Sequence, residues 1–132
     1  MKMNIFLAPL VLGIFSAPVA AAEISTHVLD VAKGVGGADV PVTLSQRDDA
    51  GKWVVVSEGR TDANGRVRTF GSNKNFEPGI YRLHFDMTTY PDASMKPFFP
   101  EITVTFSVSN AAGHYHVPVV VSPYGYSTYR GN

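Results

Sequence analysis

The sequence contains no cysteine, so a disulfide framework and a lipid-modified cysteine behind a signal sequence are both excluded. It also lacks an excess of either charge, because 11 Lys and Arg balance 11 Asp and Glu without clustering. Proteins that bind nucleic acid or anionic membranes normally carry a basic patch. Without disulfides the domain must be stabilised by its core. Without a charged patch the expected partner is a small molecule or another subunit.

A hydrophobic run long enough to cross a membrane is missing as well. The most apolar stretch, residues 5–15, has eleven residues, whereas a bilayer span needs about 20. Lys2 precedes this stretch, and small residues from Ser16 to Ala22 follow it, which is the pattern of a cleavable secretory signal. We therefore expect residues 1–22 to be a signal peptide that directs export, to a periplasm, and residues 23–132 to form one domain of 110 residues.

Helical periodicity is the third absence. No segment of helical length carries an apolar stripe, whereas alternation with period two recurs along the chain. Tyr81, Leu83 and Phe85, for example, share one side of a strand-like segment. The predicted class is all-β, with roughly eight strands spaced as in a sandwich.

The expected strands have turn or loop sequences between them. They cover residues 24–29, 40–45, 53–56, 66–70, 79–85, 102–108, 114–122 and 125–130. Asn64-Gly65 is a turn sequence that accepts positive φ. Residues 87–100 contain three prolines and no alternation, which predicts a long surface loop, and a short helical turn is expected near Asn73 to Glu77.

Histidine is the residue type with the most chemical potential in this chain. His114 and His116 stand two positions apart on an expected strand, so their side chains share one face. A His-x-His pair can hold zinc, with His27 as a third ligand. A second interpretation needs no metal, because a neutral imidazole can accept a proton from water near neutral pH. The simplest interpretation is a pair of partly exposed strand histidines without a chemical role. His84 is expected to be a surface histidine.

Arg66 and the C-terminal tail are the other candidates. Arg66 directly follows the Asn64-Gly65 turn. The N–H donors of its guanidinium could hold an anionic or carbonyl-rich planar substrate. The alternative is that Arg66 is a solvated residue at the start of a strand. The tail from Ser122 to Asn132 carries three tyrosines and an arginine. Such a tail is expected to pack, either as an edge strand or at a site where tyrosine hydroxyls meet a ligand.

Three segments together resemble a known family. They are His114-Tyr115-His116-Val117-Pro118 with the tail Ser122-Pro123-Tyr124-Gly125-Tyr126-Ser127-Thr128-Tyr129-Arg130-Gly131, the segment Ser25-Thr26-His27-Val28-Leu29-Asp30, and the turn Thr61-Asp62-Ala63-Asn64-Gly65-Arg66. They resemble the signatures of the transthyretin-like 5-hydroxyisourate hydrolases, the enzymatic relatives of transthyretin. The resemblance spans essentially all of residues 23–132.

The resemblance implies a fold, an assembly and a reaction. The fold is a transthyretin-like (prealbumin-like) β-sandwich of two four-stranded sheets with one short helix. The assembly is a homotetramer, a dimer of dimers, with active sites in a channel where dimers meet. The reaction is hydrolysis of the lactam ring of 5-hydroxyisourate, in urate and purine degradation, to 2-oxo-4-hydroxy-4-carboxy-5-ureidoimidazoline, with no metal or other cofactor.

The resemblance also implies site residues. The family's catalytic histidines correspond to His27 and His116, its arginine to Arg66, and the tyrosine of its terminal tetrapeptide to Tyr129. The residues implied to bind substrate are His27, Arg66, Tyr129, Arg130, Gly131 and Asn132. Asn132 departs from the family pattern, which ends in serine or threonine. The alternative is a non-catalytic small-molecule binding protein of the transthyretin type.

Overall fold

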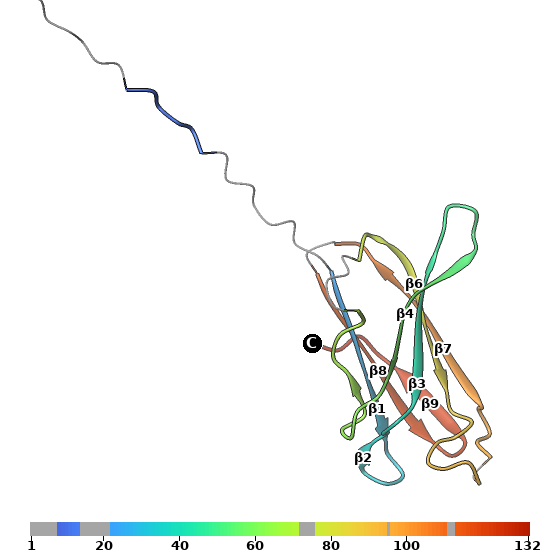
Figure 1. Ribbon diagram of the computed structural model, residues 1–132. Helices are drawn as coiled ribbons and strands as arrows, with labels where there is room; N and C mark the ends of the chain where they lie inside the picture. The colour runs from blue at the N-terminus through green and yellow to red at the C-terminus, as the bar shows by residue number, and fades with distance from the viewer. Residues whose placement is uncertain (1–7, 14–21, 72–75, 95, 111–112) are drawn as a thin grey trace, which may run out of the picture.

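The computed structural model describes residues 8–13, 22–71, 76–94, 96–110 and 113–132, and two β-sheets make up its folded part (Figure 1). Nine strands occur in the described residues: β1 (Glu23–Asp30), β2 (Val35–Gly36), β3 (Pro41–Arg47), β4 (Trp53–Arg60), β5 (Arg66–Val67), β6 (Gly79–Asp86), β7 (Glu101–Val108), β8 (His114–Ser122) and β9 (Gly125–Thr128). The all-β prediction is confirmed.

The strands divide into a four-stranded and a five-stranded sheet. The first has the order β4-β3-β6-β7 and is antiparallel throughout. The second has the order β2-β1-β8-β9, with β1 and β8 parallel. The short strands β2 and β5 pair with successive parts of one edge of β1, at residues 29–30 and 26–27. One sheet therefore has the four strands expected, and the other has a fifth because β2 was not foreseen.

Several strand bounds differ from those expected. The strand predicted over residues 66–70 ends at Val67, because β1 offers β5 only Thr26 and His27 as partners. The last strand ends at Thr128, and β4 extends beyond Val56 to Arg60. The described part of the segment 87–100 contains no strand, as predicted. No helix occurs in the described residues, and the helical turn expected near Asn73 to Glu77 falls mainly on residues 72–75, outside them.

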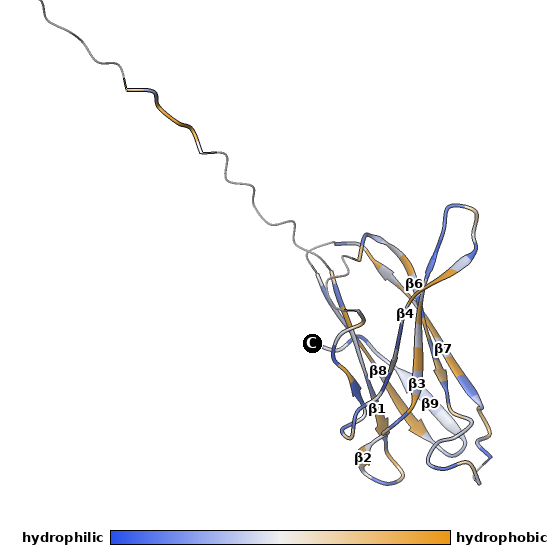
Figure 2. Cartoon of the chain, in the orientation of Figure 1, coloured by the Kyte–Doolittle hydropathy of each residue, from blue (hydrophilic) through white to orange (hydrophobic). Residues whose placement is uncertain are grey.

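The core lies between the two sheets and comes from the alternating apolar positions. In β6, Tyr81, Leu83 and Phe85 are buried while the intervening residues are partly exposed. In β8, Tyr115, Val117, Val119 and Val121 are buried in the same way. Hydrophobic colour accordingly follows strands of both sheets in Figure 2. Burial of these side chains removes apolar surface from water, the main stabilisation of a domain without disulfides.

Residues 8–13, part of the predicted signal peptide, lie apart from the sandwich (Figure 1). Leu10, Val11 and Leu12 are all highly exposed there. A helix of sufficient length and apolarity to cross a bilayer is not found among the described residues.

Candidate active site

Antiparallel pairing of β1 with β5 places His27 directly opposite Arg66. Along β1, Ile24, Thr26 and Val28 face the core, so His27 belongs to the outer face of the five-stranded sheet. The main-chain N–H of Val28 donates to Gly65 O at 2.8 Å, which holds the turn before Arg66 against β1. Two residues 39 positions apart in the sequence thus meet on one surface.

His116 joins this surface from β8. The parallel register of β1 and β8 pairs Ser25 with His116 and His27 with Pro118. His116 is half-buried and alternates with core residues Tyr115 and Val117, so it also belongs to the outer face. The structure therefore brings His27, Arg66 and His116 together on one face.

Each of the two imidazoles has a defined hydrogen-bond partner. Asn64 O lies 2.8 Å from His27 Nε2, and because a carbonyl only accepts, the proton is on Nε2. Neutral His27 therefore has its lone pair on Nδ1. His116 Nδ1 lies 2.8 Å from the hydroxyl oxygen of Ser25, a group that can donate or accept.

Both histidines are held neutral. Burial lowers the pKa of His27 below its ordinary value of 6.5, opposed by the bond to Asn64 and reinforced by the positive charge of Arg66. Burial also lowers the pKa of His116, and the positive charge of Arg66 and the neighbouring His27 act in the same direction. At pH 7 both rings are therefore available as proton acceptors.

The turn that carries Arg66 is braced by Asp62. Its carboxylate accepts hydrogen bonds from the main-chain N–H groups of Asn64 and Arg66, each at 2.9 Å. These bonds lower the pKa of Asp62, that to Arg66 most. The same turn therefore positions both Arg66 and the carbonyl that binds His27.

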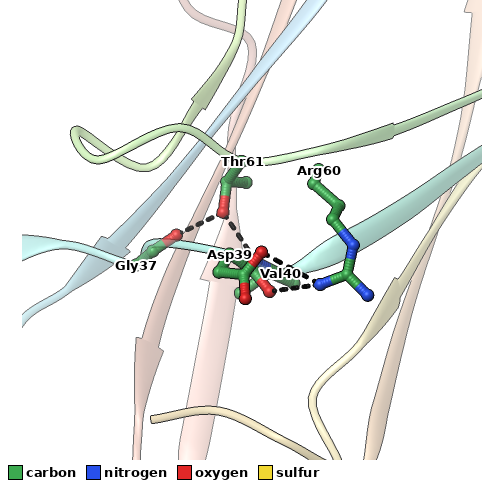
Figure 3. A network of polar contacts seen from close by, with 5 residues as sticks. All are labelled: Gly37, Asp39, Val40, Arg60 and Thr61. Atoms are coloured by element: carbon green, nitrogen blue, oxygen red, sulfur yellow. Dashed lines mark hydrogen bonds and ion pairs between the residues drawn. The ribbon is translucent and has the colours of Figure 1, made fainter.

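Thr61 anchors the start of this turn to the segment before β3. Its hydroxyl donates to Gly37 O at 2.6 Å and accepts from the main-chain N–H of Val40 at 2.8 Å (Figure 3). Beside it, Arg60 Nη1 donates to the carboxylate of Asp39 at 3.0 Å (Figure 3). Thr61 is buried, so the hydrogen bonds of its hydroxyl are protected from water.

The C-terminal tail returns along β8 to His116. The N–H of Gly131 donates to His116 O at 2.8 Å, and a Cβ on Gly131 would lie 2.5 Å from Cδ2 of the imidazole. A side chain at position 131 would therefore force the ring or the tail to shift. The Arg130 guanidinium stacks 4.9 Å from the centre of the Tyr115 ring, so its side chain packs on the strand, and its main chain adjoins Gly131. Tyr129 and Asn132 are both exposed.

The remaining histidines lie elsewhere. His114 Nδ1 is 3.0 Å from an exposed carboxylate oxygen of Glu23. Within the described residues, no three His, Cys, Asp or Glu side chains gather in a way that could hold a metal ion. His84 lies on β6 in the other sheet and pairs with Glu101 at 3.0 Å, in agreement with its prediction as a surface histidine.

A cavity of about 300 Å³ lies away from the histidines, near the ends of β1 and β8. Asp30, Tyr90, Phe98 and Tyr126 are among its lining residues, whereas His27, Arg66 and His116 are not. The predicted site is instead an open surface of the five-stranded sheet.

Sequence reasoning did not single out Ser25 and Asn64 as contacts of the two imidazoles. Ser25 stands two positions before His27, which places both on one face of a strand. The sequence therefore indicated that Ser25 shares a face with His27. The pairing of Ser25 with His116, however, depends on the parallel register of β1 and β8. Asn64 acts through its main-chain carbonyl, for which side-chain identity gives no signal.

The fold and the site define a transthyretin-type β-sandwich with two neutral histidines and an arginine on the outer face of one sheet. The model of the HIUase/Transthyretin family matches residues 24–131, and the chain belongs to this family.

Individual relatives agree with this assignment. The chain is 39% identical over 138 residues, with all of both chains covered, to a 5-hydroxyisourate hydrolase of Salmonella dublin. A solved 5-hydroxyisourate hydrolase of Klebsiella pneumoniae matches 84% of this chain and 99% of its own, with a TM-score of 0.72 and 29% identity. Transthyretin from Sparus aurata matches 82% of this chain and 95% of its own, with a TM-score of 0.75 and 29% identity. The fold is thus shared by relatives described as hydrolases and by transthyretin.

Proposed function

We propose that this protein is a hydrolase that opens the lactam ring of 5-hydroxyisourate to give 2-oxo-4-hydroxy-4-carboxy-5-ureidoimidazoline, a step of urate degradation. The observation that carries the proposal is the meeting of His27, His116 and Arg66 on one sheet face, with both imidazoles neutral. The similarity to curated 5-hydroxyisourate hydrolases over the full chain supports the choice of substrate.

The chemistry follows from these groups. One imidazole takes a proton from water as the water oxygen bonds to the lactam carbonyl carbon. The C–N bond then breaks, its electron pair stays on nitrogen, and the imidazolium formed in the first step returns its proton to that nitrogen, while the other imidazole orients the water. Arg66 binds the substrate and stabilises the negative charge that develops on the carbonyl oxygen. Tyr129 and the main chain of residues 130–132 close the site around the planar ring.

We also propose assembly into a homotetramer, with the sites in a channel between dimers. An exposed aromatic group supports an interface between copies, because exposed apolar patches commonly mark such surfaces. Phe98 and Tyr124 are 66% and 82% exposed, and their ring centres lie 6.2 Å apart.

Export to a periplasm is a further part of the proposal. It rests on the signal pattern of residues 1–22 and on the position of residues 8–13 outside the sandwich. In that setting the domain 23–132 would act as the mature enzyme.

The function is tested by mixing purified protein with freshly generated 5-hydroxyisourate and following its ultraviolet absorbance. We expect decay much faster than in buffer, unaffected by exhaustive chelation. Decay at the buffer rate would reject the proposal, and binding of aromatic ligands without turnover would then favour a transthyretin-type carrier. Loss of activity on chelation would instead favour a zinc enzyme.

The site is tested with His116→Asn and Arg66→Glu. Each should reduce turnover by at least about 100-fold, the usual scale for losing a proton-transfer or charge-stabilising group, while the tetramer persists in sedimentation. His84→Asn is the matched control, because His84 lies on the other sheet, and it should keep the wild-type rate. Unchanged rates in both site variants would mean that these residues are not the catalytic ones.

A further inference from the structure

Ser25 is one of five buried polar residues among the described ones, and it belongs to a sheet face on which the proposed reaction takes place. It is 7% exposed, whereas its neighbour on that face, His27, is partly exposed. The parallel register puts Ser25 opposite His116, and its hydroxyl oxygen lies 2.8 Å from His116 Nδ1. Ser25 thus contacts His116, a proposed catalytic residue, although Ser25 itself was not among the predicted site residues.

The His116 ring is confined on two sides. Ser25 lies at Nδ1, and Gly131 lies against the Cδ2 edge, where even a Cβ would come within 2.5 Å. The bond from Gly131 N–H to His116 O keeps the tail in that place. In this arrangement Nδ1 of His116 lies at Ser25, and Nε2 is the nitrogen left for the substrate.

We propose that Ser25 is a positioning residue for the hydrolysis: it accepts a hydrogen bond from Nδ1–H of His116, which leaves Nε2 of that ring unprotonated and directed at the substrate. A histidine can act as a base only through its unprotonated nitrogen, and the partner of the other nitrogen decides which one that is. Asn64 O has the corresponding role for His27, where Nε2 carries the proton. The inference rests on the proposed function, because it assigns Ser25 a part in that reaction.

The electrostatic surroundings keep the His116 ring neutral, the form that can act as a base. The charged and titratable groups that act on His116 are Arg66 from β5, His27 from β1 and His114 from its own strand, and all three lower its pKa together with burial, the largest cause. The main chain of Ser25, as distinct from its hydroxyl, acts in the opposite direction and raises the pKa of His116. A partner raises the pKa of an imidazole when it accepts a hydrogen bond from the protonated ring.

The test compares Ser25→Ala with Ser25→Thr, which keeps the hydroxyl, and with Ser45→Ala. Ser45 is the matched control, because it is a buried strand serine at 4% exposure in the other sheet. We expect Ser25→Ala to lower kcat by about 10- to 100-fold, the loss typical when the partner that orients a functional histidine is removed, with KM changed much less. Ser25→Thr should restore most of kcat, and Ser45→Ala should leave it unchanged.

Two further readouts separate positioning from a merely structural role. Nitrogen-15 NMR of wild-type His116 should show the proton on Nδ1 at pH 7, and Ser25→Ala should show a mixture of the two neutral forms. The acid limb of the pH–rate profile should move to lower pH in Ser25→Ala, because the imidazolium loses an acceptor. These directions would reverse if Ser25 donated to Nδ1.

The proposal is overturned if Ser25→Ala keeps the wild-type kcat, if only its KM changes, or if wild-type His116 carries its proton on Nε2. The NMR measurement on the wild type decides the last point even if Ser25→Ala does not fold. A wild-type protein that folds but does not turn over 5-hydroxyisourate would reject the proposed function instead. In that case the NMR result alone would support or overturn the hydrogen bond from His116 Nδ1–H to the Ser25 hydroxyl.

Discussion

At the scale of the residue, the proposed chemistry depends on two histidines whose protonation and orientation are set by neighbouring groups. His27 has its proton on Nε2 because a carbonyl lies 2.8 Å away, and His116 is confined between Ser25 and Gly131. The pKa of each is lowered, first by burial. Histidine is useful near neutral pH because small changes in its surroundings move it between charged and neutral forms.

The pH dependence of activity follows from these directions. A pKa below 6.5 for both rings means that they stay neutral at pH 7 and become protonated only as the pH falls through the lowered pKa values. We therefore expect kcat/KM to be constant around pH 7 and to have an acid limb whose midpoint lies below 6.5. The measurement is the initial rate across a pH series, corrected for decay in buffer. An acid limb centred above 6.5 would contradict neutral imidazoles as the acting form.

At the scale of the element, the turn between β4 and β5 unites two parts of the site. Asp62 braces it from within, Thr61 anchors its start, and Gly65 O accepts from Val28 N–H on β1. The turn approaches β1 closely, since a Cβ on Gly65 would lie 2.4 Å from Val28 O. Its exact path therefore sets the position of Arg66 relative to His27.

Gly65→Ala tests this close approach. Gly65 has φ +79°, and Gly51 has φ +80° with open space around it, so Gly51→Ala is a control for the conformational cost alone. Holding alanine in this region costs about 1 to 3 kcal/mol, and only Gly65→Ala adds a clash with main chain. We expect Gly65→Ala to unfold at lower denaturant concentration than Gly51→Ala and to lose activity, while Gly51→Ala keeps it. Equal effects of the two variants would show that the approach to β1 does not matter.

At the scale of the whole molecule, the sandwich begins before the residue at which the predicted mature chain starts. Ala22 is 1% exposed, forms an isolated bridge with Phe76 and belongs to the core. Cleavage after Ala22 would remove this buried residue from the mature protein, whereas cleavage one residue earlier would keep it.

A chain of residues 22–132 should therefore be more stable than one of residues 23–132. The buried methyl group alone is worth about 1 kcal/mol, which corresponds to a Tm difference of about 4 °C for a domain of this size. Thermal unfolding of the two chains at equal concentration measures it. Ala22→Gly in the longer chain removes only the methyl group and should account for most of the difference. Equal Tm values would show that Ala22 adds nothing to the core.

Much of the fold could be predicted because its strands have one buried and one exposed face. Tyr81, Leu83 and Phe85 alternate in the sequence as they do in β6, so both the strand and its buried side followed directly. The two-residue strand β2 could not be predicted this way, because two residues show no alternation. The early end of β5 depends on how much of β1 is available for pairing, a property of a distant segment.

The sequence by itself determined the class of the fold, the buried face of the long strands and, through family resemblance, His27, Arg66, His116 and Tyr129 as the residues to examine. Each of these follows from local pattern or motif. Only the tertiary structure decided that β1 and β8 run parallel with Ser25 beside His116, that Asn64 O meets His27, and that Gly131 lies against the His116 ring. The physical reason is that the protonation and direction of an imidazole depend on atoms within about 3 Å of it, and here those atoms come from segments that are 15 to 91 residues away in the sequence.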